Sequence, residues 1–213
     1  MATTQKVLQY KQPQKSYDVI IVGGGLHGLA TAYYLARYHG IKRIAVLERR
    51  YIGSGGSGRN TEMVRSNKRA HETLPFYKES LAMWDGLSSE LEWNLMVQKK
   101  GLLALAHSDG ELSSMRMQSD GQRRAGIKID MLTPAEIKKM VPSLDVSDRP
   151  ALPVVGGQFH PEGGTVHHDA AVWGFAKTAA RLGVDICTGV EVVGFNTEGE
   201  KVTGVKTNVG DIS

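Results

Sequence analysis

The sequence predicts an α/β fold that begins with a parallel strand, helix and strand. Val19–Val22 form a continuous apolar run, as expected of a parallel strand buried on both faces. Residues 26–38 have apolar side chains at helical spacing, and Ile44–Leu47 form a second apolar run. Gly40 stands where the helix would end, a position that favours glycine. Together these segments indicate one βαβ unit.

Three glycines occupy the turn between the first strand and the helix. Gly23, Gly25 and Gly28 satisfy the pattern G-x-G-x-x-G. In this pattern the first glycine permits a tight turn, the second lets a pyrophosphate approach the backbone, and the third lets helix and strand pack closely. Glu48 ends the second strand, where a carboxylate can accept hydrogen bonds from ribose hydroxyls. The segment therefore predicts a Rossmann-like dinucleotide-binding domain.

The residues after Glu48 bear on which dinucleotide binds. An acidic residue there disfavours NADP, whose 2′-phosphate it would repel, but it does not separate NAD from FAD. Arg49 follows, and then a second glycine-rich loop, residues 53–67 (GSGGSGRNTEMVRSN). Such a loop can bring further backbone N–H groups to a flavin, whereas NAD enzymes of this fold usually have a crossover helix in this place. The loop favours FAD.

The remaining elements follow from periodicity and turn residues. Phe76, Leu81, Trp84 and Leu87 are expected to share one face of a helix. Thr133 and Pro134 mark the start of a short helix, and Asp169 is expected to cap a later one. The segments, in order, are a helix at 74–91, a strand at 101–107, helices at 109–125 and 133–144, a strand at 153–160, a helix at 169–182, a strand at 184–187 and a meander with turns near Gly199 and Gly210.

Composition excludes some classes of function. The net charge of +4 comes from basic residues spread along the chain, which argues against nucleic-acid binding. Cys187, the single cysteine, cannot form an internal disulfide, and its apolar surroundings favour a buried structural thiol over a nucleophile. The polar residues 1–16 contain no apolar signal, and no run is long enough to span a membrane. We expect a cytoplasmic protein with a flexible amino-terminal arm.

Four stretches of sequence carry a more specific resemblance, and two of them, GRN…VRSN and the HDA motif before a Trp-containing helix, go beyond a generic dinucleotide fingerprint. They are YDVIIVGGGLHGLATAYYLA, the pair Glu48–Arg49, the loop at 53–67 and GGTVHHDAAVWGFA at 163–176. From Tyr17 to its end the chain resembles the amino-terminal half of the beta-subunit family of heterotetrameric sarcosine oxidase. That family lies in the D-amino-acid-oxidase-like (GR2-type) group of FAD-dependent amine oxidoreductases. The resemblance implies a FAD-binding domain at 17–92 and 151–213, with part of an inserted antiparallel substrate domain at 93–150.

The same resemblance implies a FAD site. The pyrophosphate would lie near the fingerprint glycines and His27, and the adenosine ribose near Glu48. For His27 an exposed position in the first helical turn is an equal alternative. The implied cofactor-binding residues are Gly23, Gly25, His27, Gly28, Glu48, Arg49, Gly56, Ser57, Thr61, Met63 and Val192, with the backbone of the last at the adenine.

The resemblance also implies a second flavin. The family binds FMN covalently through a histidine that precedes an aspartate at the start of a helix, and His168 matches that position. From the residues alone, His167 and His168 are polar residues at a helix entrance. A metal site is the third interpretation, but His160 is the only nearby further ligand, and we expect no metal.

The implied activity is oxidative demethylation of sarcosine or a related N-methyl amino acid, together with the other sarcosine oxidase subunits. A carboxylate substrate requires a cationic partner, for which Arg65 and Arg69 are local candidates. Surface or phosphate-contacting roles explain these arginines equally well, so no catalytic residue is assigned. An NAD-dependent dehydrogenase and a non-catalytic flavin-binding fragment are the alternatives.

Overall fold

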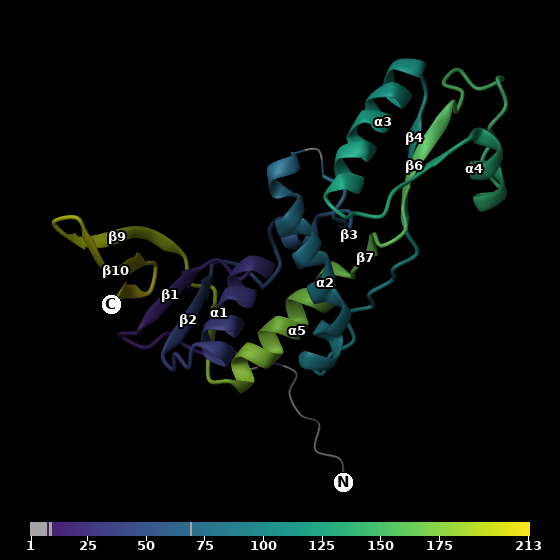
Figure 1. The fold of residues 1–213 in the computed structure, drawn as a ribbon. Coiled ribbons are helices and arrows are strands. Elements are labelled where there is room, and N and C mark those ends of the chain that lie inside the picture. The colour runs from purple at the N-terminus through teal and green to yellow at the C-terminus, as the bar shows by residue number, and fades with distance from the viewer. Residues whose placement is uncertain (1–7, 9, 69) are drawn as a thin grey trace, which may run out of the picture. The chain divides into compact units, whose positions relative to one another are not determined.

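The computed structural model describes residue 8, residues 10–68 and residues 70–213, which fall into two compact units. The first unit comprises the described residues up to 61, with 88–95 and 167–213, and the second comprises 62–87 and 96–166 (Figure 1). This division differs from the functional domain bounds expected above, which stay a prediction. The elements, in chain order, are β1 (Val19–Val22), α1 (Leu26–Tyr38), β2 (Ile44–Glu48), η1 (Gly56–Gly58), β3 (Met63–Val64), η2 (His71–Thr73), α2 (Leu74–Glu90), β4 (Leu102–Ala106), α3 (Asp109–Arg124), β5 (Asp130–Leu132), α4 (Pro134–Met140), β6 (Gly156–His160), β7 (Gly164–Thr165), α5 (His168–Arg181), β8 (Asp185–Thr188), β9 (Val192–Glu198), β10 (Lys201–Thr207) and β11 (Gly210–Ile212).

A parallel sheet of order β1-β2-β8 forms the centre of the first unit. Val19 pairs with Ile44 and Ala45 pairs with Asp185, so the predicted βαβ unit and the return of the chain to the sheet are confirmed. Helices α1 and α5 lie side by side (Figure 1), with the Tyr33 and Phe175 rings 5.6 Å apart. All residues of β2 are buried, because this central strand has neighbours on both edges.

The predicted meander is confirmed as a second sheet, of order β11-β10-β9. It packs on the parallel sheet through Val205 and Ile212, which share an apolar cluster with Leu47 and Cys187. The Cys187 side chain is 0% exposed, and burial, followed by the nearby Asp185 carboxylate, raises the pKa of its thiol to about 11. Cys187 is therefore a buried structural thiol, as the sequence indicates.

Part of the amino-terminal arm is anchored to β8. The Lys11 backbone N–H donates to the carbonyl of Ile186 at 3.0 Å, and the Lys11 ammonium lies 2.5 Å from the Asp185 carboxylate. Gln14 and Tyr17 also donate to Asp185, whose residue is only 3% exposed. These contacts hold residues 11–17, a segment expected from its polarity to be flexible, against the edge of the parallel sheet.

The second unit contains an antiparallel sheet of order β4-β6-β5 with α3 and α4 packed on it. Thr133 and Glu136 form a capping box at the start of α4, which confirms the predicted cap. Phe76 corrects one expectation. It is 71% exposed, because it follows the buried Leu74 by two residues and so lies on the opposite side of α2.

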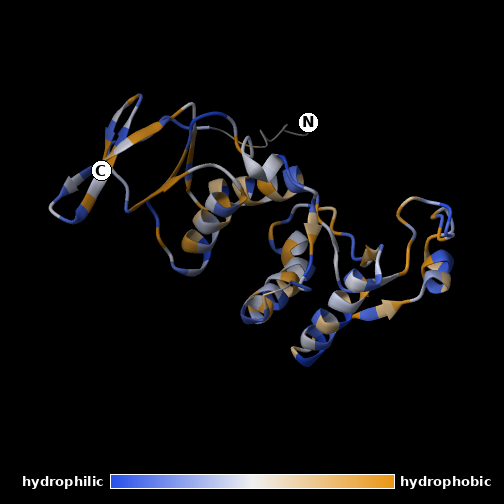
Figure 2. Cartoon of the chain, turned by 90° about the horizontal axis from the view of Figure 1, so that it is seen from above, coloured by the Kyte–Doolittle hydropathy of each residue, from blue (hydrophilic) through white to orange (hydrophobic). Residues whose placement is uncertain are grey.

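The helices of both units contain hydrophobic as well as hydrophilic residues (Figure 2). This mixture is expected of a helix that packs one face against a sheet and exposes the other to solvent. None of the helices within the described residues has the length and apolar character needed to cross a membrane.

Candidate dinucleotide site

The turn between β1 and α1 requires glycine at two of the fingerprint positions. Gly23 has φ of +105°, in the left-handed region that side chains rarely adopt, and its N–H donates to the carbonyl of Leu47 at 2.8 Å. A Cβ atom at Gly28 would lie 2.1 Å from the carbonyl oxygen of Gly23. The helix therefore approaches the strand as closely as the fingerprint predicts, and the amino terminus of α1 faces the turn.

The Glu48 carboxylate lies against this turn. Its Oε2 accepts a hydrogen bond from the N–H of Gly24 at 2.8 Å, and its Oε1 accepts one from the N–H of Arg50 at 2.8 Å. Glu48 is 8% exposed, so these contacts fix a nearly buried charge at the end of β2. A carboxylate accepts about four hydrogen bonds, which leaves capacity for hydroxyl donors. Gly24 was missed from the sequence because the fingerprint does not include it.

The second glycine-rich loop meets the fingerprint turn. Ser57 Oγ accepts a hydrogen bond from the N–H of Leu26 at 2.8 Å, so it satisfies one of the unpaired donors of α1. The N–H of Gly53 donates to the carbonyl of Gly24 at 2.9 Å. A Cβ atom at Gly25 would lie 3.1 Å from Ser57 Oγ. These contacts place the second glycine-rich loop directly against the fingerprint turn.

A pocket of about 240 Å³ opens beside Glu48. It brings together predicted residues from separate segments, and its lining comprises Val22, Gly23, Leu47, Glu48, Arg49, Val190, Glu191 and Val192. Arg49 pairs with Glu191 across 3.7 Å at its rim. The sequence reading missed Val190 and Glu191. Their place directly before Val192 was the available signal.

Several predicted residues do not line this pocket, among them His27, Thr61 and Met63. His27 is exposed in the first turn of α1, and its part in the site stays a prediction. Thr61 is exposed within the glycine-rich loop. Met63 belongs to β3 of the second unit, and its part in the site stays a prediction.

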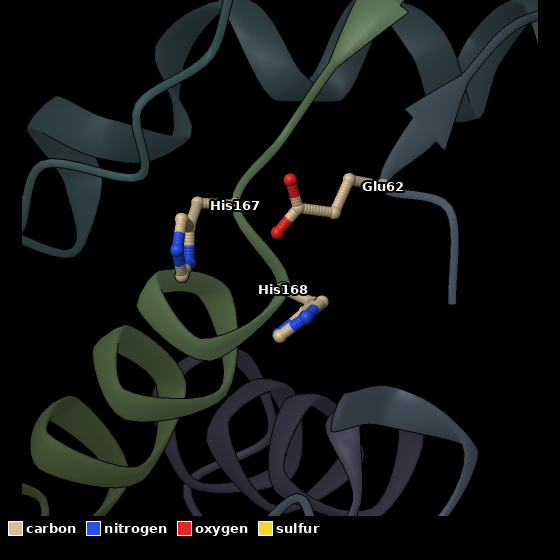
Figure 3. Close-up of side chains that lie close together, drawn as sticks. All are labelled: Glu62, His167 and His168. Carbon is tan, nitrogen blue, oxygen red and sulfur yellow. The ribbon is translucent and has the colours of Figure 1, made fainter. Parts of the chain in front are cut away.

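The two adjacent histidines open α5 (Figure 3). His167 is the N-cap, and its Nδ1 accepts a hydrogen bond from the N–H of Ala170 at 3.3 Å. The expectation that Asp169 caps this helix is therefore wrong. Asp169 lies in the first turn, where the helix dipole stabilises a carboxylate. Its Oδ1 is 3.0 Å from Nδ1 of His168. The His168 side chain is 23% exposed.

The second unit contains Arg65, one of the two candidate partners of a substrate carboxylate. Arg65 lines a pocket of about 770 Å³ together with Asn67, Lys68 and Gln158. Arg69, the other candidate, lies outside the described residues. His160 is fully buried in the same unit, where its Nδ1 is 3.0 Å from the carbonyl oxygen of Lys128.

The chain belongs to the DAO family of FAD-dependent oxidoreductases, whose family model matches residues 18–213. Sarcosine oxidase subunit beta of Rhizobium meliloti (strain 1021) is 46% identical over 94% of this chain and 48% of that protein. The subunit beta of Arthrobacter sp is 43% identical over 94% of this chain and 50% of that protein. The family and cofactor class predicted from the sequence are confirmed, and the NAD-dependent alternative is not favoured.

Solved structures agree on the fold. L-proline dehydrogenase from P. horikoshii is similar with a TM-score of 0.84 and 30% identity, covering 95% of this chain and 51% of that one. Glycine oxidase from Bacillus cereus ATCC 14579 has a TM-score of 0.81 and 28% identity, covering 92% of this chain and 53% of that one. The predicted fold class is confirmed. The chain spans about half the length of the relatives it matches.

Proposed function

We propose that this chain is the FAD-binding part of an amine oxidoreductase of the sarcosine oxidase beta type. Its substrate is sarcosine or a related N-methyl amino acid, and it works with the other subunits of such an oxidase. The observation that carries the proposal is the Glu48 carboxylate, held against the fingerprint turn beside the pocket that contains Val192. The identity to sarcosine oxidase beta subunits supports the substrate class.

The residues present fit a dinucleotide. The pocket beside Glu48 has apolar walls for an adenine and a carboxylate for ribose hydroxyls. The amino terminus of α1, with the fingerprint glycines and the backbone of His27, suits a pyrophosphate. Gly56, Ser57, Thr61 and Met63 are proposed to lie along the flavin.

FAD, when bound, supplies a two-electron acceptor for the hydride of an N-methyl group. The chain's own residues bind and orient. Glu48 holds the ribose by charge-assisted hydrogen bonds, which are stronger than neutral ones. Arg65 is proposed to bind the substrate carboxylate, because a guanidinium forms two parallel hydrogen bonds to a carboxylate.

A glutamine substitution tests the FAD site. Glu48→Gln keeps the shape of the side chain but removes its charge, so we expect the FAD dissociation constant to rise about tenfold to a hundredfold. Absorbance titration of the apoprotein with FAD measures this. Glu191→Gln is the control, because Glu191 is half-exposed at the rim of the same pocket and should change the constant little. Equal effects of the two variants would contradict the assigned role of Glu48.

We further propose that His168 binds FMN covalently. The bound FMN would supply an electrophilic ring methyl, and a neutral imidazole nitrogen is a competent nucleophile. Attachment would form a C–N bond and break one methyl C–H bond with loss of a proton, and the two electrons left on the flavin ring would pass to oxygen, the acceptor of an oxidase. The Asp169 carboxylate beside Nδ1 orients the ring and supports Nε2 as the attached atom. The start of α5, capped by His167, holds the imidazole in place.

Mass spectrometry of a peptide spanning residues 163–177 tests this proposal, using protein purified with the subunits that accompany it. An acid-stable FMN adduct should be present in the natural sequence and in His167→Asn, because asparagine is also a good N-cap. His168→Asn should lack the adduct. Protein that contains FAD but has no adduct on His168 would refute the two-flavin proposal and leave a single-flavin oxidase.

A further inference from the structure

Three buried polar side chains hold three consecutive residues in the second unit. His160, Gln158 and Gln122 are 0%, 6% and 1% exposed. The contacts are His160 Nε2 to Ser66 Oγ (3.2 Å), Asn67 Nδ2 to Gln158 Oε1 (2.9 Å) and Gln122 Nε2 to the Lys68 carbonyl oxygen (3.1 Å). Each residue of the segment 66–68 therefore has its own partner from α3 or β6.

Two of these side chains, Gln158 and Gln122, also bind each other. The Gln158 amide donates to Ser119 Oγ at 2.7 Å and to Gln122 Oε1 at 3.2 Å. Burial lowers the pKa of His160, and its Nδ1 faces the Lys128 carbonyl, so Nε2 is the acceptor that meets Ser66. Buried polar groups cost free energy unless they are paired, and among the described residues Asn67 Oδ1 is the one buried side-chain atom without a hydrogen-bond partner. The hydrogen bonds that Gln158, Gln122 and His160 make therefore indicate a demand for position.

The segment carries a cation at each side. Arg65 precedes it and Lys68 ends it, and both line the pocket of about 770 Å³. Burial, and then the charge of Arg65, lower the pKa of Lys68. Glu111 lines the same pocket, but its Oε2 already accepts a hydrogen bond from the N–H of His107 at 2.7 Å. The network thus holds two repelling cations near one another, an arrangement that favours an anion.

We propose that Gln158 is a positioning residue for carboxylate binding. Its hydrogen bond to the side-chain amide of Asn67 holds this residue in place between Arg65 and Lys68, so that Arg65 meets the substrate carboxylate with a smaller loss of loop entropy. Preorganisation of this kind raises affinity by lowering the cost of ordering on binding. The inference rests on the proposed function, because it takes an amino acid as the substrate.

The test compares two glutamine variants in the full-length protein purified with its accompanying subunits. Gln158→Met keeps the length of the side chain but removes the amide, and we expect KM for sarcosine to rise about fivefold to tenfold. The value of kcat should change less than twofold, because the lost interaction serves binding and not the chemical step. Gln98→Met is the matched control, because Gln98 is exposed in the same unit and does not line this pocket, and it should leave both constants near those of the natural sequence.

A second variant guards against misfolding. Asn67→Ala breaks the same hydrogen bond from the segment side and leaves the buried core intact, so it should raise KM by a similar factor. The double variant should be no worse than either single variant, because both remove one interaction. The affinity for acetate, measured from the change in flavin absorbance, should fall in the same variants in which KM rises.

The outcomes separate the two claims. If the natural sequence oxidises sarcosine while Gln158→Met and Asn67→Ala match Gln98→Met in KM, the positioning role of Gln158 is wrong and the proposed function stands. A fall in kcat with unchanged KM would also overturn that role. If the natural sequence contains flavin but oxidises no N-methyl amino acid, the proposed function itself fails.

Discussion

At Gly28 the first helix approaches the strand before it so closely that a methyl group does not fit. This residue follows from sequence reasoning, because the fingerprint encodes a local contact between neighbouring segments. The N-cap of α5 did not follow, although it is equally local. His167 and Asp169 both have acceptor atoms at the helix entrance, and a shift of two residues is below the resolution of sequence patterns.

Gly28→Ala should be destabilising for this reason. The new Cβ atom would lie 2.1 Å from the Gly23 carbonyl oxygen, so we expect a loss of about 1–3 kcal/mol in the free energy of unfolding. Chemical denaturation measures this. Gly86→Ala is the control, because its position in α2 has open space, and alanine should stabilise the helix by up to about 1 kcal/mol. A stable, FAD-binding Gly28→Ala protein would contradict the close approach.

The buried thiol of Cys187 predicts how the stability of the folded protein depends on pH. Its pKa is raised from 9.0 to about 11 in the folded protein, so the folded state keeps the neutral thiol longer than the unfolded state does. This contribution to stability is present in full below pH 9 and is lost as the pH rises through 11. We expect no reaction with a thiol reagent at pH 8 until denaturant is added. Fast labelling of the native protein would show that the thiol is not buried.

At the scale of elements, the strands of the parallel sheet were the most predictable part. Strands β1 and β2 are apolar runs apart from Glu48, as expected of parallel strands in a central sheet. Strand β8 has Ile186 and Cys187 between the polar Asp185 and Thr188. The docking of the amino-terminal arm was not predictable. It depends on Lys11 and Asp185, which are 174 positions apart, and a polar arm has no pattern that reveals such a partner.

The arm contact can be tested with Lys11→Met. The change removes a cation from the 3%-exposed Asp185 and leaves Gln14 and Tyr17 as its partners. Because the Lys11 side chain is half-exposed, we expect a modest loss of about 1–2 kcal/mol in the free energy of unfolding. Arg149→Met, which removes an exposed ion pair with Asp145, should cost less than about 1 kcal/mol. Equal losses would indicate that the arm is not anchored through Asp185.

At the scale of the whole molecule, a few motifs were enough to predict the family, but they did not predict how the residues proposed to bind the substrate are positioned. The fingerprint, the glycine-rich loop and the HHD stretch are continuous in sequence, so the flavin-binding class was accessible. The network that holds residues 66–68 joins them to Gln122, Gln158 and His160, which periodicity alone assigns to separate elements. Sequence reasoning therefore identified Arg65 as a candidate without showing what positions it.

We propose above that this chain binds FAD for the oxidation of an N-methyl amino acid. The most direct measurement is the flavin absorbance of the protein, purified with its accompanying subunits, when sarcosine is added without oxygen. We expect a yellow protein whose flavin absorbance bleaches on addition of sarcosine and returns when oxygen is admitted. A colourless protein, or flavin that stays oxidised with every N-methyl amino acid tried, would contradict it.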